Sequence, residues 1–155
     1  MTLPAVEDLN NIEMDMRYLT MQAFIQAGNA ALETLSAALV PGDEEIRWRA
    51  AASLAWIGNP TAIPAIERAS IGADYALKYN CIWGLGQIGD KAAVPALLNI
   101  VQADDSESPD VRYNAALALL RLGERAYLEG AVSSDNEGTY RVAHAALAAA
   151  RWLGD

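Results

Sequence analysis

The fold is decided by the stretch Leu77–Leu98, LKYNCIWGLGQIGDKAAVPALL. It contains Gly84-x-Gly86-x-x-Gly89, the spacing of the dinucleotide-binding fingerprint, in which the glycines follow a strand and open a helix. The residues before Gly89, however, have the apolar spacing of a helix and do not alternate as a strand would. Pro95 then suits the first turn of a second helix. The stretch therefore predicts a helix, a glycine turn and another helix, with no nucleotide cofactor.

The same pattern recurs along the chain. A glycine follows each helical run at spacings of 30, 31, 34 and 31 residues, at Gly28, Gly58, Gly89, Gly123 and Gly154. Self-similarity of this period indicates a repeat protein, and glycine suits the left-handed position that ends a helix. We expect first helices near 17–27, 46–57, 75–88, 109–122 and 140–153. Second helices are expected near 3–10, 30–40, 62–70, 92–102 and 125–132.

Counting back from each glycine predicts which side of the first helix is buried. At about 100° per residue, the positions one, four, five, eight and twelve back share one face. Four back stand mainly large apolar residues: Phe24, Leu54, Leu85, Leu119 and Ala150. Eight back stand small ones: Thr20, Ala50, Cys81, Ala115 and Ala146. We therefore expect Gly84 in the core, Gly86 on the outer side, and Cys81 as an inert buried thiol.

The units DVRYNAALALLRLGE (Asp110–Glu124) and Leu77–Leu98 resemble HEAT-like repeats of the phycobilisome-lyase type. That pattern runs V-R-x-x-A-A-x-A-L-x-x-I-G-D and then A-V-P-x-L. The resemblance covers nearly the whole chain and is strongest over 43–133. It implies an all-α, right-handed α-solenoid of about five helix pairs. The expected single domain spans 1–155, with repeats at about 1–11 (partial), 12–41, 42–72, 73–107, 108–138 and 139–155 (partial).

Aromatic residues gather on the outward side of the first helices. Ten residues before each glycine stand Tyr18, Trp48, Tyr79, Tyr113 and His144. The same sector adds Trp56, Trp83, Trp152, Leu117, Gln26, Gln87 and Arg121. The ten residues before each glycine contain no Asp or Glu, whereas Arg49, Arg121 and Arg151 do occur there. The resemblance implies that this side lines the concave surface of the solenoid.

Tryptophan, tyrosine and arginine are enriched in binding hot spots. We therefore predict an aromatic, locally basic binding surface formed by Tyr18, Trp48, Arg49, Trp56, Tyr79, Trp83, Tyr113, Arg121 and His144. The alternative is that these aromatic residues stack between neighbouring repeats, and the two interpretations are not exclusive.

A basic residue stands eleven positions before four of the five glycines, at Arg17, Arg47, Lys78 and Arg112. In three repeats an acid precedes it by two residues, at Asp15, Glu45 and Asp110. This pattern favours a ladder of acid–base contacts between repeats over a substrate site.

Composition excludes several classes of function. The 155 residues are 53% hydrophobic and carry 20 acids against 11 basic residues, a net charge of −9. An acidic chain is a poor ligand for nucleic-acid phosphates. No basic leader or membrane-length apolar run is present, and the single cysteine fits a reducing compartment. We expect a cytoplasmic protein that binds neither nucleic acid nor membranes.

The sequence offers no catalytic residues. An outward face without acids cannot supply a general base or a carboxylate pair. His144 has no second histidine and no nearby cysteine, so no metal site is expected. The resemblance points the same way, because HEAT-like di-iron hydroxylases use His–Glu pairs and this chain has one histidine. Whether the chain serves an enzyme is left open, with a non-enzymatic role favoured.

Three functions are compatible with these features. The first is a non-enzymatic binding or scaffold module whose concave face holds a protein or peptide. The second, implied by the resemblance, is a subunit of a bilin lyase or a bilin-handling relative acting on phycobiliproteins, with bilin as the only cofactor considered. The third is a structural fragment of a longer solenoid with no dedicated ligand.

The two ends of the sequence suggest a further contact. Leu3–Val6 aligns with the start of the second helices, and 152–155 closes a first helix that has no second helix after it. Val142, Ala146, Ala149 and Leu153 form an apolar stripe on that last helix. Because solenoid ends need polar caps, we expect self-association or a second HEAT-like subunit there; the resemblance implies the latter, since bilin lyases of this family are commonly heterodimers.

Overall fold

The structure is a computed structural model that describes residues 2–40, 42–103 and 106–154. Met1, Pro41, Asp104, Asp105 and Asp155 lie outside the described residues, and with them the expected ends of the domain and of the 12–41 repeat. The described residues form helices and contain no strand, which confirms the expected all-α solenoid.

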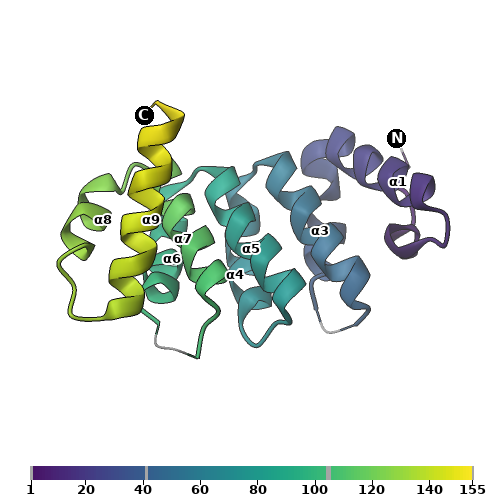
Figure 1. Cartoon of the computed structure of the whole chain (residues 1–155). Helices are drawn as coiled ribbons and strands as arrows, with labels where there is room; N and C mark the ends of the chain where they lie inside the picture. The colour runs from purple at the N-terminus through teal and green to yellow at the C-terminus, as the bar shows by residue number, and fades with distance from the viewer. Residues whose placement is uncertain (1, 41, 104–105, 155) are drawn as a thin grey trace.

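The helices form two layers (Figure 1). The first layer contains the A helices: α1 (Met14–Ala27), α3 (Glu44–Ile57), α5 (Tyr75–Ile88), α7 (Pro109–Arg121) and α9 (Glu137–Leu153). Each A helix packs against the next one along the chain. Their limits agree with the predicted ones to within three residues.

The second layer contains shorter B segments. They are η1 (Val6–Asn10), η2 (Gly28–Ala31) with α2 (Leu32–Ala37), η3 (Pro60–Ala62) with α4 (Ile63–Ser70), η4 (Lys91–Ala93) with α6 (Val94–Val101), and α8 (Arg125–Ala131). The first of these was expected as a helix over 3–10 but is a 3₁₀ turn of five residues, and no side chain caps its start. α2, α4, α6 and α8 each pack on the A helix that follows them.

A glycine stands at the end of each A helix as predicted, but Gly28, with φ 57° and ψ −128°, does not take the left-handed helical conformation expected there. Gly58, Gly89 and Gly154 take the left-handed conformation, with φ of 73°, 79° and 86°. Asn59 and Asp90 then accept the backbone N–H two residues further on, at 2.9 and 2.8 Å, and start the 3₁₀ turns. Since a helix precedes Gly89 and none begins at Gly84 or Gly86, the glycines form no phosphate cradle.

The buried face of the A helices is wider than predicted. The large residues four before each glycine, Phe24, Leu54, Leu85 and Leu119 among them, are fully buried as expected. The residues seven before the last four glycines are buried as well, namely Ala51, Ile82, Ala116 and Leu147. The reason is that each central A helix contacts an A helix on either side in addition to the B layer.

Gly84 and Gly86 allow α5 to approach both neighbours in the A layer. A Cβ atom on Gly84 would lie 3.2 Å from the Cβ of Ala55 on α3. A Cβ atom on Gly86 would lie 2.6 Å from the Cβ of Ala118 on α7. The placement of Gly86 on the outer side was therefore wrong: it is buried where two A helices touch.

The basic residues eleven before each glycine do not form the expected acid–base ladder. Arg47 donates to the carbonyl of Leu39 at 3.2 Å, and Arg112 donates to the carbonyl of Val101 at 2.9 and 3.3 Å. Arg17 donates in the same way to the carbonyl of Asn11. These carbonyls stand at the ends of B segments, where free C=O groups and the helix dipole attract a cation. Lys78 instead pairs with Glu107 at 2.9 Å, an acid at the end of its own repeat.

The apolar stripe on α9 is mostly covered within the chain. Val142 and Ala146 are buried and Ala149 is half-buried, because α7 and α8 pack against α9. Leu153 remains 82% exposed beside the exposed Trp152. The expected open stripe is thus reduced to the last turn of the helix, and self-association there remains a prediction.

We predict that Gly86→Ala destabilises the protein. Overpacking against Ala118 costs about 1–3 kcal/mol, against a gain of about 0.5–1 kcal/mol from replacing a helical glycine. Because the added Cβ would clash with both the Cβ and the Cα of Ala118, the upper end of this cost applies, and urea unfolding should show a net loss of about 2 kcal/mol. Gly130→Ala on α8 is the matched control, because a Cβ there meets nothing within 4 Å, and it should be neutral or stabilising. Equal stability of Gly86→Ala and the wild type would contradict this packing.

Candidate functional site

The candidate site lies on the A-helix face, the surface of α1, α3, α5, α7 and α9 that is turned away from the B layer. Two aromatic groups occupy it between α3 and α5. We call Trp48, Tyr75 and Tyr79 the Trp48 cluster, and Trp56 with Trp83 the Trp83 pair. The first is on the N-terminal half of the two helices and the second is on the C-terminal half.

The Trp48 cluster lines an open hollow of about 400 Å³, together with Ala76 and Asn80. The rings of Tyr75 and Tyr79, one helical turn apart, have centroids 5.9 Å from each other and are 56% and 39% exposed. Trp48 is half-buried and packs against the core. The hollow therefore has a fixed floor on α3 and an accessible aromatic wall on α5.

Two hydrogen bonds hold the α5 wall in place. Asp74 caps α5 by accepting the N–H of Leu77 at 3.0 Å, which fixes the turn that carries Tyr75. Asn114 on α7 donates to the backbone carbonyl of Tyr79 at 3.0 Å. The wall is thus tied to the neighbouring repeat as well as to its own helix start.

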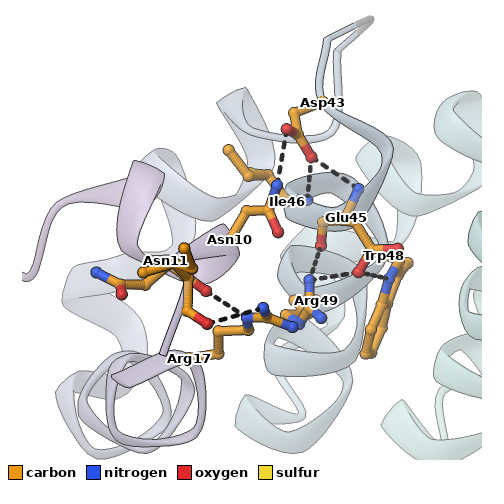
Figure 2. A network of polar contacts seen from close by, with 9 residues as sticks. Asn10, Asn11, Arg17, Asp43, Glu45, Ile46, Trp48 and Arg49 are labelled. Atoms are coloured by element: carbon orange, nitrogen blue, oxygen red, sulfur yellow. Dashed lines mark hydrogen bonds and ion pairs between the residues drawn. The ribbon is translucent and has the colours of Figure 1, made fainter. Parts of the chain in front are cut away.

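Glu45 holds both Trp48 and Arg49 in the first turns of α3 (Figure 2). Its carboxylate accepts the indole N–H of Trp48 at 3.2 Å and pairs with Arg49 at 2.7 Å. The guanidinium carbon of Arg49 lies 4.3 Å from the centroid of the Trp48 ring, a cation–π contact. Arg49 is only 7% exposed, so its charge is neutralised and enclosed.

This arrangement corrects the expectation of an outward face without acids. The sequence argument considered the ten residues before each glycine, and Glu45 stands thirteen before Gly58. Residues three and four apart on a helix are neighbours, so an acid in the first turn reaches Trp48 and Arg49. The expected locally basic surface is accordingly not basic at α3.

Asp43 anchors the start of α3 (Figure 2). Its side chain accepts the N–H of Glu45 and of Ile46, at 2.9 and 3.1 Å, and the amide of Asn10 at 2.9 Å. The N–H of Ile46 is the main cause that holds the pKa of Asp43 below its usual value. The ionised carboxylate therefore fixes the helix turn on which Glu45 stands.

The Trp83 pair joins neighbouring repeats directly. The rings of Trp56 and Trp83 meet edge to face, with centroids 5.6 Å apart and planes at 60°. Such pairs stabilise beyond their buried area. Trp56 nevertheless stays 57% exposed. Both interpretations of the aromatic residues, stacking between repeats and an outward binding surface, are compatible here, because these rings stack between repeats and still face outward.

The remaining predicted residues do not join these groups into one surface. Tyr18 is exposed on α1, Tyr113 is half-buried against the core, and Arg121 is exposed in the last turn of α7. His144 stacks on Tyr140 of α9, with centroids 5.8 Å apart. Trp48 and Tyr79 line one hollow, whereas Trp83 pairs with Trp56 at the other end of the two helices.

Sequence reasoning missed Tyr75 and Tyr140. Tyr75 stands fourteen before Gly89 and Tyr140 fourteen before Gly154, outside the counted positions. Both precede a predicted site residue by four, namely Tyr79 and His144. The i, i+4 spacing was the available signal, because it places the two rings on one side of the helix.

Cys81 is fully buried in α5, and burial raises the pKa of its thiol to about 12. Within the described part of the chain, no group of three or more His, Cys, Asp or Glu side chains could hold a metal ion. Among the same residues, no helix has the length and apolar character needed to cross a membrane.

Two antiparallel layers of short helices with a glycine after each A helix define a helical-repeat protein. The family model for HEAT repeats matches residues 66–151, more than half of the chain, and the chain belongs to this family. The model for the PBS lyase HEAT-like repeat matches residues 46–71, which contain α4 and all of α3 except its first two residues.

Two solved structures are similar to the chain. Human deoxyhypusine hydroxylase in complex with glycerol superposes with a TM-score of 0.65 and 26% identity, over 88% of this chain and 47% of that one. The chain thus spans about half the length of that relative. The complex of CpcE and CpcF of phycocyanin lyase from Nostoc sp. superposes with a TM-score of 0.50 and 18% identity, over 89% of this chain and 72% of that one. This second similarity shows a likeness of fold alone. No curated protein matches the sequence.

We predict that Cys81 does not react in the folded protein. With a pKa of about 12 against about 8.5 in an unfolded chain, its thiolate fraction at pH 8 falls by at least about a thousandfold. Thiol titration with a coloured disulfide reagent should be complete within minutes in urea and negligible in buffer. Cys81→Ser is the blank. Reaction of the native protein at the unfolded rate would contradict the burial of this thiol.

Proposed function

We propose that the protein is a non-enzymatic binding module that presents the A-helix face to a protein or peptide partner. The observation that carries this proposal is the Trp48 cluster. Two exposed tyrosines lie beside a tryptophan that is already held by Glu45 and Arg49. Rigid aromatic side chains offer a large contact area at low entropic cost, and hot spots are enriched in them.

The repeat architecture supports the same proposal. Stacked helix pairs build an extended surface, which repeat proteins commonly use for binding. The phycocyanin lyase relative is a complex of two chains, CpcE and CpcF, which supports a protein partner or a second subunit for this fold.

A role as a bilin lyase subunit is the second candidate. The match to the PBS lyase HEAT-like repeat favours it, because residues 46–71 include Trp48, Arg49 and Trp56. A tetrapyrrole would stack on the aromatic rings, and its propionates would need free cations. Arg49 is already paired with Glu45, which places the bilin candidate second.

We predict that a partner retained by the immobilised protein from an extract of the source organism is lost on Tyr79→Ala. Truncating one hot-spot aromatic costs about 2 kcal/mol or more, roughly a thirtyfold weaker complex. Trp48→Ala and Trp83→Ala should also abolish binding. Thermal unfolding monitored by circular dichroism checks that each variant remains folded.

Ile71→Ala is the control, since Ile71 is an exposed apolar residue at the end of α4 in the B layer and its loss should leave this partner bound. If Tyr79→Ala, Trp48→Ala and Trp83→Ala lower stability and leave binding intact, the aromatic residues serve only to stack the repeats.

The bilin candidate predicts a red-shifted or sharpened visible band when the chain is mixed with a bilin at micromolar concentration. The proposed protein-binding role predicts an unchanged bilin spectrum. A spectrum that changes with wild type and not with Trp48→Ala would favour the lyase-related role over the one proposed here.

A further inference from the structure

The N-terminal ends of the A helices carry exposed acids. These ends lie along one edge of the molecule for α3, α5, α7 and α9, the lower edge in Figure 1. We call the following five exposed residues the acidic edge: Asp43, Glu44, Glu45, Asp110 and Glu137. Acids favour this position because the helix dipole is positive at the N-terminus.

The basic residues near this edge already have partners within the protein. Arg47 and Arg112 turn inward to carbonyls of the B layer, and Lys78 pairs with Glu107. Arg49 and Arg141 pair with Glu45 and Glu137 on their own helices. Glu45 and Glu137 are balanced by these arginines, whereas Asp43, Glu44 and Asp110 form no ion pair among the described residues, so the field at this edge is negative.

The Trp48 cluster adjoins the acidic edge. Glu44 precedes Trp48 by four residues and so lies on the same side of α3. Glu45 is bonded to the indole N–H of Trp48, and Asp74 immediately precedes Tyr75. The hollow itself is lined by aromatic rings, Ala76 and Asn80, and these acids stand at the starts of the two helices that form it.

Aromatic faces attract cations, and the contact of Arg49 with Trp48 shows this attraction within the site. The exposed rings of Tyr75 and Tyr79 offer the same interaction to a cation from outside. A carboxylate entering the hollow would instead meet negative ring faces and like charges. Both the aromatic rings and the nearby acids therefore favour a positively charged ligand.

We propose that the Trp48 hollow takes an arginine or lysine side chain from a basic peptide segment of the partner, and that flanking basic residues of that segment face the acidic edge. This inference rests on the proposed binding function and specifies the chemistry of the occupant. The open hollow of about 400 Å³ suits one long side chain with its neighbouring backbone.

Selection from a random twelve-residue peptide library displayed on phage tests the inference without assuming a sequence. Clones are enriched on the wild-type chain and then depleted on Tyr75→Ala/Tyr79→Ala, two substitutions at exposed positions that should leave the fold intact. We expect the surviving clones to carry a clear excess of arginine and lysine. Survivors without that excess would overturn the inference and leave the proposed function standing. A selection with no aromatic-dependent clones would overturn both.

Calorimetric titration of a synthetic peptide from the selection gives the second test. Replacing its basic residues by glutamine should weaken binding at least tenfold, and raising the salt from 50 to 200 mM should weaken the original peptide several-fold. Glu44→Gln should lower the affinity several-fold, whereas Glu33→Gln, at an exposed acid on α2, should not. Equal binding of the glutamine peptide, or insensitivity to both salt and Glu44→Gln, would contradict a cationic occupant.

Discussion

The close contact of neighbouring A helices is the constraint on which the rest of the structure depends. Gly84 against Ala55 and Gly86 against Ala118 bring the backbone of α5 near both α3 and α7. Helices that approach so closely leave no room for large side chains between them. The large aromatic residues are therefore accommodated on the open side of the layer, where Trp48 meets the tyrosines of α5 across the repeat boundary.

The distribution of charged residues follows from the same two-layer arrangement. Each B segment ends near the start of an A helix, and arginines from the A helices donate to the free carbonyls at those ends. Arg47 and Arg112 are thereby drawn toward the B layer, while acids stay at the exposed starts of the A helices. A chain with more acidic than basic residues thus has an acidic edge next to an aromatic hollow.

Much of this architecture could be predicted from the sequence. The period of the glycines and the spacing of residues such as Leu54 and Leu85 fix the A helices, because both depend on local geometry that repeats. Which sides of each A helix are buried could not be predicted in the same way. Counting from one buried face assigns Gly86 outward, whereas the next A helix in the layer buries it.

The sequence predicted the individual residues of the candidate site but not which of them lie together. Trp48, Tyr79, Trp56 and Trp83 were found from their positions before each glycine, but which rings meet depends on the offset between neighbouring helices. The partner of Arg49 was missed because Glu45 lies outside the window of ten residues. The targets of Arg47 and Arg112 are backbone carbonyls, which sequence patterns do not reveal.

The central claim is that the aromatic side of the A layer is the binding surface. The most direct measurement maps the backbone amide NMR signals of the labelled protein before and after addition of its partner. The account predicts that the largest shifts cluster at residues 44–49 of α3 and 75–80 of α5. Shifts concentrated in α4 and α6, with these two segments unchanged, would contradict it.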